Sequence, residues 1–270
     1  MVLSRSIKQF RHIVYTYYAR HARTLPWRET YDPYRILVSE IMLQQTQVSR
    51  VLQKYRSFLH RFPTIQMLAK ARMRDVLKEW QGLGYNRRAL LLHRCARAVV
   101  LIYKGKIPRQ RGILRSLPGI GEATSGALCA FAYNAPEVFI ETNIRSVFIH
   151  HFFADKKNVN DKELLTIIEK ALDRKNPRKW YSALMDYGVF LKNTLANPSR
   201  KSLHYKKQTP FKGSRRQIRG KILKLLAEKN RAKESQMCSY LCVDKTTLSE
   251  ILASLCKEGL VKQKGKMVWI

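Results

Sequence analysis

The sequence of 270 residues is poor in acidic residues. It has 19 Asp and Glu against 52 Lys and Arg, which gives a formal net charge of +33 at pH 7. This excess is far larger than solubility requires, and it indicates a polyanionic partner. Nucleic acid is the foremost candidate.

Long hydrophobic runs are also missing. No segment approaches the roughly 18 apolar residues that a membrane-spanning helix needs, so we expect no membrane partner. The first 23 residues interleave basic residues with aromatics and contain no apolar signal-peptide core. We therefore expect a cytoplasmic protein, associated with the nucleoid if the organism is a prokaryote.

Cysteine is scarce, and the five cysteines are scattered along the chain. Only Cys238 and Cys242 lie close together, and no histidine follows His204. A four-ligand metal site cannot be assembled from this region. We expect all five cysteines to be reduced and to pack as small apolar residues, and we expect no metal.

Helical spacing of apolar residues dominates the chain from Ser4 to Phe190. Turns are predicted at Pro63, Gly82 with Gly84, Gly105, Pro118 to Gly121, and Pro136. Strand alternation is not evident here, so this region is predicted to be all-helical. The predicted helical blocks are 33–58, 73–79, 87–103, 123–133, 144–153 and 161–172.

The C-terminal region has a different pattern. Residues 196–213 are basic and rich in turn-forming residues, and we expect a linker that touches phosphate. Three helices are predicted at 217–226, 234–241 and 245–258, the last capped by Asp244 and ended by Gly259. Two short strands around a Lys-Gly turn complete a winged-helix pattern over 214–270. Thr246 and Thr247, with Ser249 and Glu250, are predicted to face outward from the third helix, where the two threonines would contact DNA; docking of a protein is the alternative.

The segment Leu117 to Thr124 lies between two predicted helices. Its glycines, Gly119 and Gly121, allow a tight turn and leave amide N–H groups unblocked at a helix N-terminus, where they can bind a phosphate. This pattern predicts a helix-hairpin-helix that holds the DNA backbone without regard to sequence. The expected DNA-contacting residues of the hairpin are Pro118, Gly119, Ile120, Gly121 and Thr124.

A second constellation lies on the helix predicted over 33–58. Glu40, Gln44 and Gln47 are spaced i, i+4 and i+7, and would share one polar face of an otherwise apolar helix. Desolvation there would raise the pKa of a carboxyl group and let it act as a general acid. The glutamines would reach base edges or fill the space of a base flipped out of the duplex.

These motifs resemble those of A/G-mismatch adenine DNA glycosylases, within the helix-hairpin-helix-GPD superfamily. The resemblance covers about residues 24 to 190 and is carried by motifs in the same order and spacing: Leu25-Pro26-Trp27-Arg28, Asp32-Pro33-Tyr34, Ser39 to Gln47, Arg61-Phe62-Pro63-Thr64, Trp80 to Tyr85, and Leu117 to Gly121. It implies a mainly α fold of two helical lobes, with the winged helix appended. The expected domains are a glycosylase domain at 1–195, with a barrel lobe at about 30–135 and a cap lobe at 1–29 plus 136–195, a linker at 196–213, and the winged helix at 214–270.

The resemblance also implies roles for individual residues. Glu40 matches the general acid that protonates the adenine ring, and Gln44 matches the residue wedged into the base stack. Glu141 stands where the family has an aspartate that stabilises the sugar cation and helps to position water, and Asn143 orients that site. DNA contacts are expected from Gln44, Gln45, Gln47 and Tyr85.

The chain departs from the family at several positions. Glu141 is one methylene longer than aspartate, and Tyr85-Asn86 replaces a pair of tyrosines. Ala123 occupies the position of a nucleophilic lysine in bifunctional relatives, so we expect a monofunctional enzyme without a strong lyase step. The segment directly after Tyr187-Gly188, where most relatives bind an iron–sulfur cluster, contains Leu191, Lys192 and Asn193 and no cysteine, so no cluster is expected. A monovalent cation at the hairpin is the only cofactor left open.

Three functions follow for this chain. The preferred one is hydrolysis of the glycosidic bond of adenine opposite guanine or 8-oxoguanine, acting as a monomer on double-stranded DNA. The second is excision of uracil, thymine or another altered base, since the family's usual C-terminal domain for 8-oxoguanine is missing. The third is a non-catalytic DNA-binding protein on a glycosylase scaffold.

Overall fold

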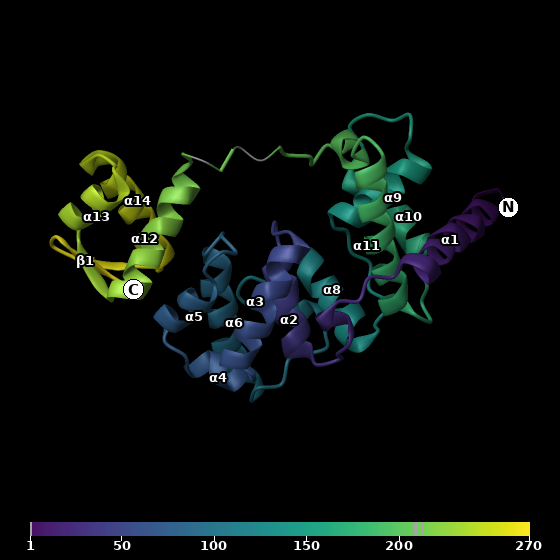
Figure 1. Cartoon of the computed structure of the whole chain (residues 1–270). Helices are drawn as coiled ribbons and strands as arrows, with labels where there is room; N and C mark the ends of the chain where they lie inside the picture. Colours follow the sequence, from purple (N-terminus) through teal and green to yellow (C-terminus); the bar gives the residue numbers. More distant parts are fainter. Residues whose placement is uncertain (1, 208–209, 212) are drawn as a thin grey trace. The chain divides into compact units, whose positions relative to one another are not determined.

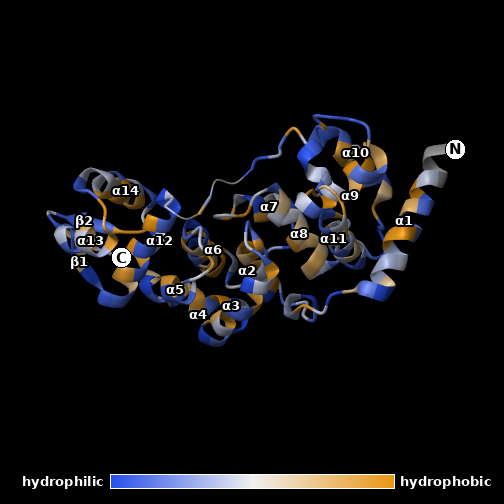
Figure 2. Cartoon of the chain, turned by 45° about the horizontal axis from the view of Figure 1, so that its top comes forward, coloured by the Kyte–Doolittle hydropathy of each residue, from blue (hydrophilic) through white to orange (hydrophobic). Residues whose placement is uncertain are grey.

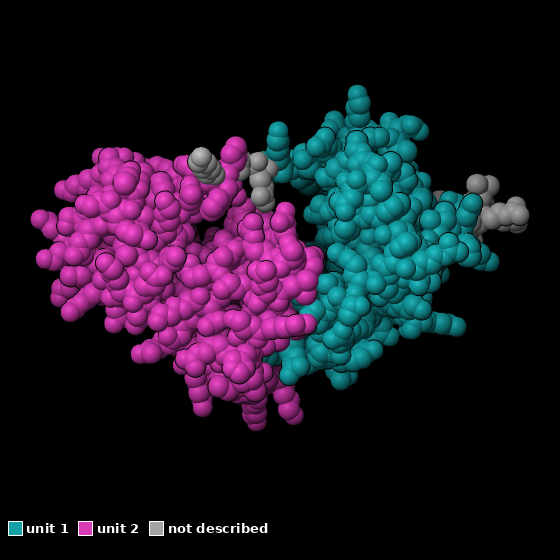
Figure 3. Space-filling model, in the orientation of Figure 1, with its two compact units in different colours: residues 1–36, 109–116, 120–207 teal, residues 37–108, 117–119, 208–270 magenta. Residues whose placement is uncertain are grey.

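The computed structural model describes residues 2–207, 210–211 and 213–270 (Figure 1). In this part of the chain it contains fourteen α-helices, two 3₁₀ helices and three short strands. The chain divides into two compact units, coloured separately in Figure 3. The units comprise residues 1–36, 109–116 and 120–207, and residues 37–108, 117–119 and 208–270.

Unit 1 is helical and is built around an aromatic cluster. Phe10 contacts Phe148 and Trp180, with ring centroids 5.1 and 5.8 Å apart, so that α1, α9 and α11 share one core. Trp180 is fully buried. The elements that lie wholly in unit 1 are α1 (Val2–His21), η1 (Pro26–Arg28), α7 (Arg111–Ser116), α8 (Glu122–Tyr133), α9 (Thr142–Phe152), α10 (Asp161–Ala171), α11 (Pro177–Thr194) and η2 (Pro198–Lys201).

Unit 2 holds the remaining helices and the sheet. Its core includes Phe58 and Trp80, with ring centroids 5.9 Å apart. Helix α2 (Pro33–Leu43) begins in unit 1 and ends in unit 2. The other elements of unit 2 are α3 (Val48–Arg61), α4 (Ile65–Lys70), α5 (Met73–Glu79), α6 (Arg87–Tyr103), α12 (Arg215–Lys229), β1 (Arg231–Lys233), α13 (Glu234–Leu241), α14 (Lys245–Glu258), β2 (Lys262–Lys264) and β3 (Met267–Trp269).

Most of the predicted helical blocks correspond to helices of the structure. Most of them alternate hydrophobic and hydrophilic segments, coloured orange and blue in Figure 2, whereas α8 is buried over the consecutive residues 124–132. The predicted blocks 73–79, 87–103, 234–241 and 245–258 coincide with α5, α6, α13 and α14. Trp27, Trp80 and Trp180 are buried core residues.

One predicted helix is wrong. The block 33–58 is two helices, α2 and α3, separated by a turn at residues 44–47. Gln45 adopts a left-handed conformation, with φ of +54°, which stops the helix. The apolar periodicity continues across the break, so the sequence pattern did not reveal it.

The C-terminal part is a winged helix with one strand more than predicted. The sheet has the order β1-β3-β2 with antiparallel pairing. Asp244 caps α14 by accepting a hydrogen bond from Thr247 N at 2.7 Å, and Gly259 ends that helix with φ of +78°, as expected. The sequence missed β1 because Arg231-Ala232-Lys233 is too short to show alternation.

The chain after α11 is more ordered than a linker. Residues 198–201 form η2, with Pro198 and Ser199 buried, and Ser202 forms a bridge with Val159 of unit 1. Asn197 caps this turn by accepting from the backbone N–H and hydroxyl of Ser199. The expected linker at 196–213 therefore begins later. The two units also differ from the expected lobes, because α8 belongs to unit 1 and the winged helix belongs to unit 2.

Candidate active site

Glu40 lies in the last turn of α2. It is partly exposed, while its neighbours Ser39 and Ile41 are buried. The start of the helix is fixed by Asp32, whose carboxylate accepts from Tyr34 N at 2.8 Å, with Pro33 in the first helical position. The cap and the buried flank fix the place of Glu40 at the end of a well-anchored helix.

Arg88 of α6 forms hydrogen bonds with the turn that follows α2. Its side chain is buried and lies over the rings of Trp80 and Tyr85, 5.5 and 5.6 Å from their centroids. Burial lowers the pKa of Arg88 to about 10, which leaves it charged at neutral pH. Its guanidinium donates to the carbonyl oxygens of Ile41, Met42, Gln44, Leu83 and Gly84 and to the hydroxyl of Thr46.

This arginine satisfies carbonyl groups at the C-terminus of α2, where no intrahelical donor remains, and its charge suits that end of the helix. Sequence analysis did not single it out, because one arginine among 52 basic residues has no distinguishing mark. It joins two loops that carry expected DNA contacts, residues 44–47 and Tyr85.

The expected polar face of Glu40, Gln44 and Gln47 is wrong. Gln44 lies in the turn beyond α2, and Gln47 is the residue that precedes α3. The glutamines are displayed on a turn because Gln45 leaves the helical conformation. Gln45 and Gln47 are exposed and Gln44 is partly exposed. Their contact with DNA stays a prediction.

The hairpin lies between α7 and α8, as expected. Gly119 has φ of +81°, and a Cβ atom there would lie 2.8 Å from Cβ of Leu91, so this position requires glycine. Gly121 precedes α8 and supplies no capping side chain. Ile120 and Thr124 are buried, so DNA would meet backbone groups at these positions. Pro118 is partly exposed.

Glu141 precedes α9 and caps it. One carboxylate oxygen accepts from the backbone N–H groups of Asn143 and Ile144 at 2.7 and 2.9 Å, and the other accepts from Nδ2 of Asn143 at 3.1 Å. Burial raises the pKa of Glu141, although these hydrogen bonds and the charge of Lys192 oppose the increase. The structure thus brings Glu141 and Asn143 together in unit 1.

Helix α11 packs against this carboxylate-bearing end of α9. A Cβ atom at Gly188 would lie 2.6 Å from the carbonyl oxygen of Asn143, so the two backbones approach closely. Lys192 is one turn further along the same face of α11, and the charge of Glu141 acts on it, although burial lowers its pKa. Oδ1 of Asn143 is buried without a hydrogen-bond partner. Lys192 is a second residue that sequence analysis missed.

Asp186 of α11 is a structural residue. Its carboxylate accepts two hydrogen bonds of 2.8 Å from Arg28, and bonds from Nε and N of Arg23 at 2.6 and 2.9 Å. Burial pushes the pKa of Asp186 upward, but the two arginines outweigh burial and leave it below its ordinary value.

Tyr85 adopts a left-handed conformation, with φ of +46°, and is 36% exposed. Its hydroxyl accepts a hydrogen bond of 2.6 Å from Arg216 of α12. The guanidinium of Arg216 also lies over the ring, 5.6 Å from its centroid. Both Arg88 and Arg216 therefore contact this expected DNA-binding residue.

The two expected threonines of α14 differ. Thr246 is exposed, as predicted. Thr247 is only partly exposed, and its hydroxyl donates to Asp244 at 2.6 Å as part of the helix cap. Ser249 and Glu250 are exposed, and Glu250 forms an ion pair with Arg215.

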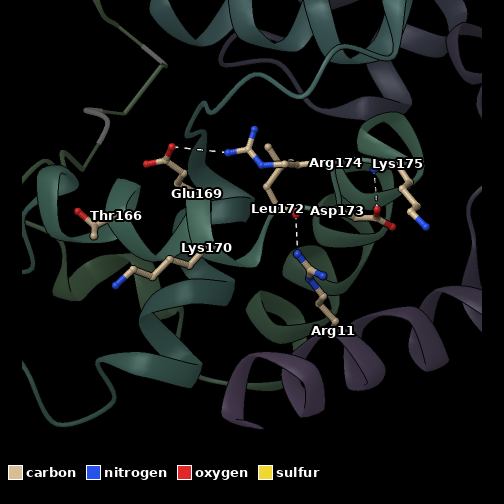
Figure 4. Close-up of a pocket in the computed structure, with 8 residues that line it drawn as sticks. All are labelled: Arg11, Thr166, Glu169, Lys170, Leu172, Asp173, Arg174 and Lys175. Carbon is tan, nitrogen blue, oxygen red and sulfur yellow. Dashed lines mark hydrogen bonds and ion pairs between the residues drawn. The ribbon is translucent and has the colours of Figure 1, made fainter. Parts of the chain in front are cut away.

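A pocket of about 650 Å³ in unit 1 is lined by Arg11 and by residues of the segment 166–175, and none of the expected site residues lines it (Figure 4). Its charged groups form hydrogen bonds at the C-terminus of α10. Arg11 donates to the carbonyl oxygens of Ala171 and Leu172, and Asp173 accepts from Lys175 N. We find no catalytic constellation there. Over the described residues, no group of three or more His, Cys, Asp or Glu side chains could hold a metal ion, and no helix is long and apolar enough to cross a membrane.

A profile described as HhH-GPD superfamily base excision DNA repair protein matches residues 38–174, which include Glu40, the hairpin and Glu141. The chain belongs to this superfamily. A winged helix DNA-binding domain matches residues 220–268. The helical HhH-GPD fold and the winged helix expected from the sequence are both confirmed.

Named relatives of this HhH-GPD protein are adenine DNA glycosylases. The protein from Mycolicibacterium smegmatis is 32% identical over 268 residues, with 92% of this chain and 91% of that protein covered. The protein from Mycobacterium tuberculosis is 43% identical over 132 residues, and the human protein is 31% identical over 206. The chain spans 43% and 37% of the length of these last two.

Solved structures agree on the fold. A thermostable thymine-DNA glycosylase is 27% identical, with a TM-score of 0.66 over 73% of this chain and 92% of that one. An endonuclease III covalent intermediate with DNA has a TM-score of 0.56 at 17% identity, with 77% of this chain and 90% of that one covered, and supports the fold alone. This HhH-GPD protein therefore has the architecture of a DNA repair enzyme.

Proposed function

We propose that this chain is a monofunctional adenine DNA glycosylase that excises adenine mispaired with guanine or 8-oxoguanine from double-stranded DNA. The observation that carries the proposal is the Glu141 carboxylate, held by Asn143 and by the N-terminus of α9. The names of the relatives, which include a full-length match in Mycolicibacterium smegmatis, support adenine as the base.

In this mechanism the base is flipped out of the duplex before the chemistry. Glu40 donates a proton to a ring nitrogen of adenine, so that the base leaves with the electron pair of the glycosidic bond. The positive charge that develops on the sugar is stabilised by the carboxylate of Glu141. Water then adds to the sugar carbon and releases a proton, which replaces the one that Glu40 gave to the base. Glu141 must be ionised for this task, and the positive charge of Lys192 favours that form against burial.

The backbone of the DNA would be held by the hairpin. Gly119 gives the turn its shape, and Gly121 leaves the first N–H groups of α8 without a side-chain cap. Amide groups at a helix N-terminus bind phosphate oxygens. A monovalent cation at the hairpin carbonyls is compatible with this arrangement and stays a proposal.

Two departures from the family define the chemistry further. Ala123 lies exposed in the first turn of α8 and offers no amine, so a Schiff base with the sugar cannot form at that residue. The segment Tyr187–Asn193 lies within α11 and contains no cysteine, so the residues present do not fit an iron–sulfur cluster, which takes four thiolates. We propose an enzyme without a strong lyase step and without a cluster, active as a monomer.

A second candidate is excision of thymine or uracil from a mismatch with guanine. The specific observation that favours it is the similarity to a thymine-DNA glycosylase, at 27% identity over 73% of this chain. Substrate choice depends on the shape of the pocket and its contacts with the exocyclic groups of the base. A non-catalytic role is the remaining alternative.

Single-turnover base release distinguishes these functions. Four duplexes would carry A opposite 8-oxoguanine, A opposite G, U opposite G and T opposite G, and Glu40→Gln and Glu141→Gln would be measured with the wild type. Release of adenine alone, lost by at least about 100-fold in both variants, is the expected result. Release of a pyrimidine would support the second candidate, and tight binding with no released base would support the non-catalytic role.

A further inference from the structure

The winged helix contains a sheet face that no function has yet been assigned to. Its three strands are in register, so that Arg231, Trp269 and Lys262 form one row across β1, β3 and β2, and Lys233, Met267 and Lys264 form the next. Register partners and residues two apart along a strand point to the same side of a sheet. These six side chains therefore share one face, which we call the sheet face.

Burial identifies the sheet face as the outer one. In the row between them, Ala232 and Val268 are buried at 3% and 0% exposure and pack into the core of the domain, while Gln263 at the edge strand β2 is exposed. Arg231, Lys233, Lys262 and Lys264 are exposed, and Met267 and Trp269 are partly exposed. The strands β1 and β2 are correspondingly coloured hydrophilic in Figure 2.

The sheet face carries an excess of positive charge, and the carboxylate next to the sheet, Glu234, accepts a hydrogen bond from Gln263. Its four cations flank an apolar strip on β3, Lys266 adds a fifth at the turn, and no carboxylate occurs in any of the three strands. Among the described residues, none of these five cations forms an ion pair, since no carboxylate oxygen lies within 4.0 Å of their charged nitrogen atoms. Unpaired cations that surround an aromatic side chain are typical of surfaces that bind nucleic acid.

Helix α14, the expected DNA-contacting element of the domain, differs in this respect. Glu250 pairs with Arg215 of α12, and Glu258 pairs with Arg219 at 2.7 Å. Arg219 also donates to the hydroxyl of Ser254 at 3.0 Å. The exposed side of α14 therefore includes carboxylates, and two cations next to it are already neutralised.

We propose that the sheet face, rather than α14, is the main DNA-binding surface of the C-terminal domain, and that it binds the phosphate backbone of duplex DNA without sequence preference. Because β3 lies between β1 and β2 and neighbouring strands are about 4.8 Å apart, the cations of β1 and β2 are about 10 Å apart. They would therefore contact different phosphates. Trp269, between Arg231 and Lys262, covers apolar sugar atoms. The inference rests on the proposed function for its ligand, DNA, but does not depend on which base is excised.

Salt dependence of binding tests this surface. Affinity of the full chain for an undamaged duplex would be measured between 50 and 200 mM salt for Lys233→Gln/Lys264→Gln and for a matched control, Lys245→Gln/Lys257→Gln, which removes two exposed lysines from α14. Each lost phosphate contact lowers the salt slope by about one and weakens binding about eightfold at 0.1 M salt. We expect a loss of about two in the slope for the sheet-face variant and little change for the control. The reverse result would overturn the proposal.

Trp269 gives an independent measurement. The other three tryptophans, Trp27, Trp80 and Trp180, are at most 7% exposed. Acrylamide quenching should therefore report mainly on Trp269, and duplex DNA should protect the wild type but not Trp269→Phe. Absence of protection, or protection by single strands and not by duplex, would also overturn the proposal. Base release by the wild type is measured separately from these binding assays, so a failure of the proposed catalytic function is distinguished from a failure of the sheet face to bind DNA.

Discussion

Arg216 of the winged helix donates a hydrogen bond of 2.6 Å to the hydroxyl of Tyr85, and its guanidinium lies over the same ring. Within unit 2 this contact joins the C-terminal domain to the loop after α5. A second contact also connects α5 with the C-terminal domain. Arg74 of α5 donates to the carbonyl oxygens of Ala227 and Glu228 at the end of α12.

The pair Arg216 and Tyr85 should show a measurable coupling. A cation over an aromatic ring at an exposed site contributes about 0.5–1 kcal/mol. In a double-mutant cycle with Arg216→Ala and Tyr85→Leu, we expect a coupling free energy of this size in urea unfolding. Additive effects of the two changes would show that the contact contributes nothing in solution.

Arg88→Met should be among the most destabilising single changes in unit 2. It removes the donors for six oxygen atoms, several of them buried, and such losses cost about 3–5 kcal/mol. Base release should fall as well, because the turn that carries Gln44 to Gln47 loses its anchor. The neighbouring exposed residue provides the control, Arg87→Met, and equal midpoints of unfolding for the two variants would contradict the role of Arg88.

Glu141→Gln should separate activity from stability. A carboxyl group with a raised pKa in the folded state stabilises the protein fully below its unfolded pKa, and this contribution is lost as the pH rises through the folded value. At pH 7 the ionised Glu141 therefore lowers the free energy of unfolding. Glutamine is uncharged and still accepts hydrogen bonds, so the substitution removes this loss of stability. We expect base release to fall at least about 100-fold while the free energy of unfolding is unchanged or higher. Exposed Glu169→Gln is the control, and a large loss of stability in Glu141→Gln would contradict the prediction.

Lys192→Met should alter the pH dependence of base release. Without this cation the pKa of Glu141 rises further, so the fall in activity on the acid side should move to higher pH. Lys192→Arg should restore the wild-type profile. The control is Lys179→Met, an exposed lysine on the same helix. An unchanged profile in Lys192→Met, measured by single-turnover release between pH 5 and 9, would exclude this positioning role.

Gly188→Ala and Gly220→Ala should have opposite effects on stability. A Cβ atom at Gly188 would lie 2.6 Å from the carbonyl oxygen of Asn143, whereas a Cβ atom at Gly220 in α12 has no neighbour within 4 Å. We expect Gly188→Ala to cost about 1–3 kcal/mol and to slow base release. Gly220→Ala should stabilise by about 0.5–1 kcal/mol, because alanine favours the helix over the unfolded chain. The midpoint of thermal unfolding, measured for both variants and the wild type, tests this prediction.

The sequence by itself determined the class of the protein. Charge excess indicated nucleic acid, periodic apolar residues placed most of the helices, and Gly119 of the hairpin marked a left-handed backbone position. Local signals of this kind depend on residues near in the chain, such as the cap formed by Asp244 or the left-handed Gly259. They need no knowledge of distant partners.

Tertiary structure alone decided the rest. The break after Leu43 depends on Arg88, which is 45 positions away and donates to the turn from another helix. The environment of Glu141 depends on Lys192 of α11, and that of Tyr85 depends on Arg216 of the winged helix. The sheet face exists because β1 pairs with β3 across more than thirty residues. Such contacts are set by packing between elements, and a single sequence carries no local mark of which distant arginine or lysine will supply the charge.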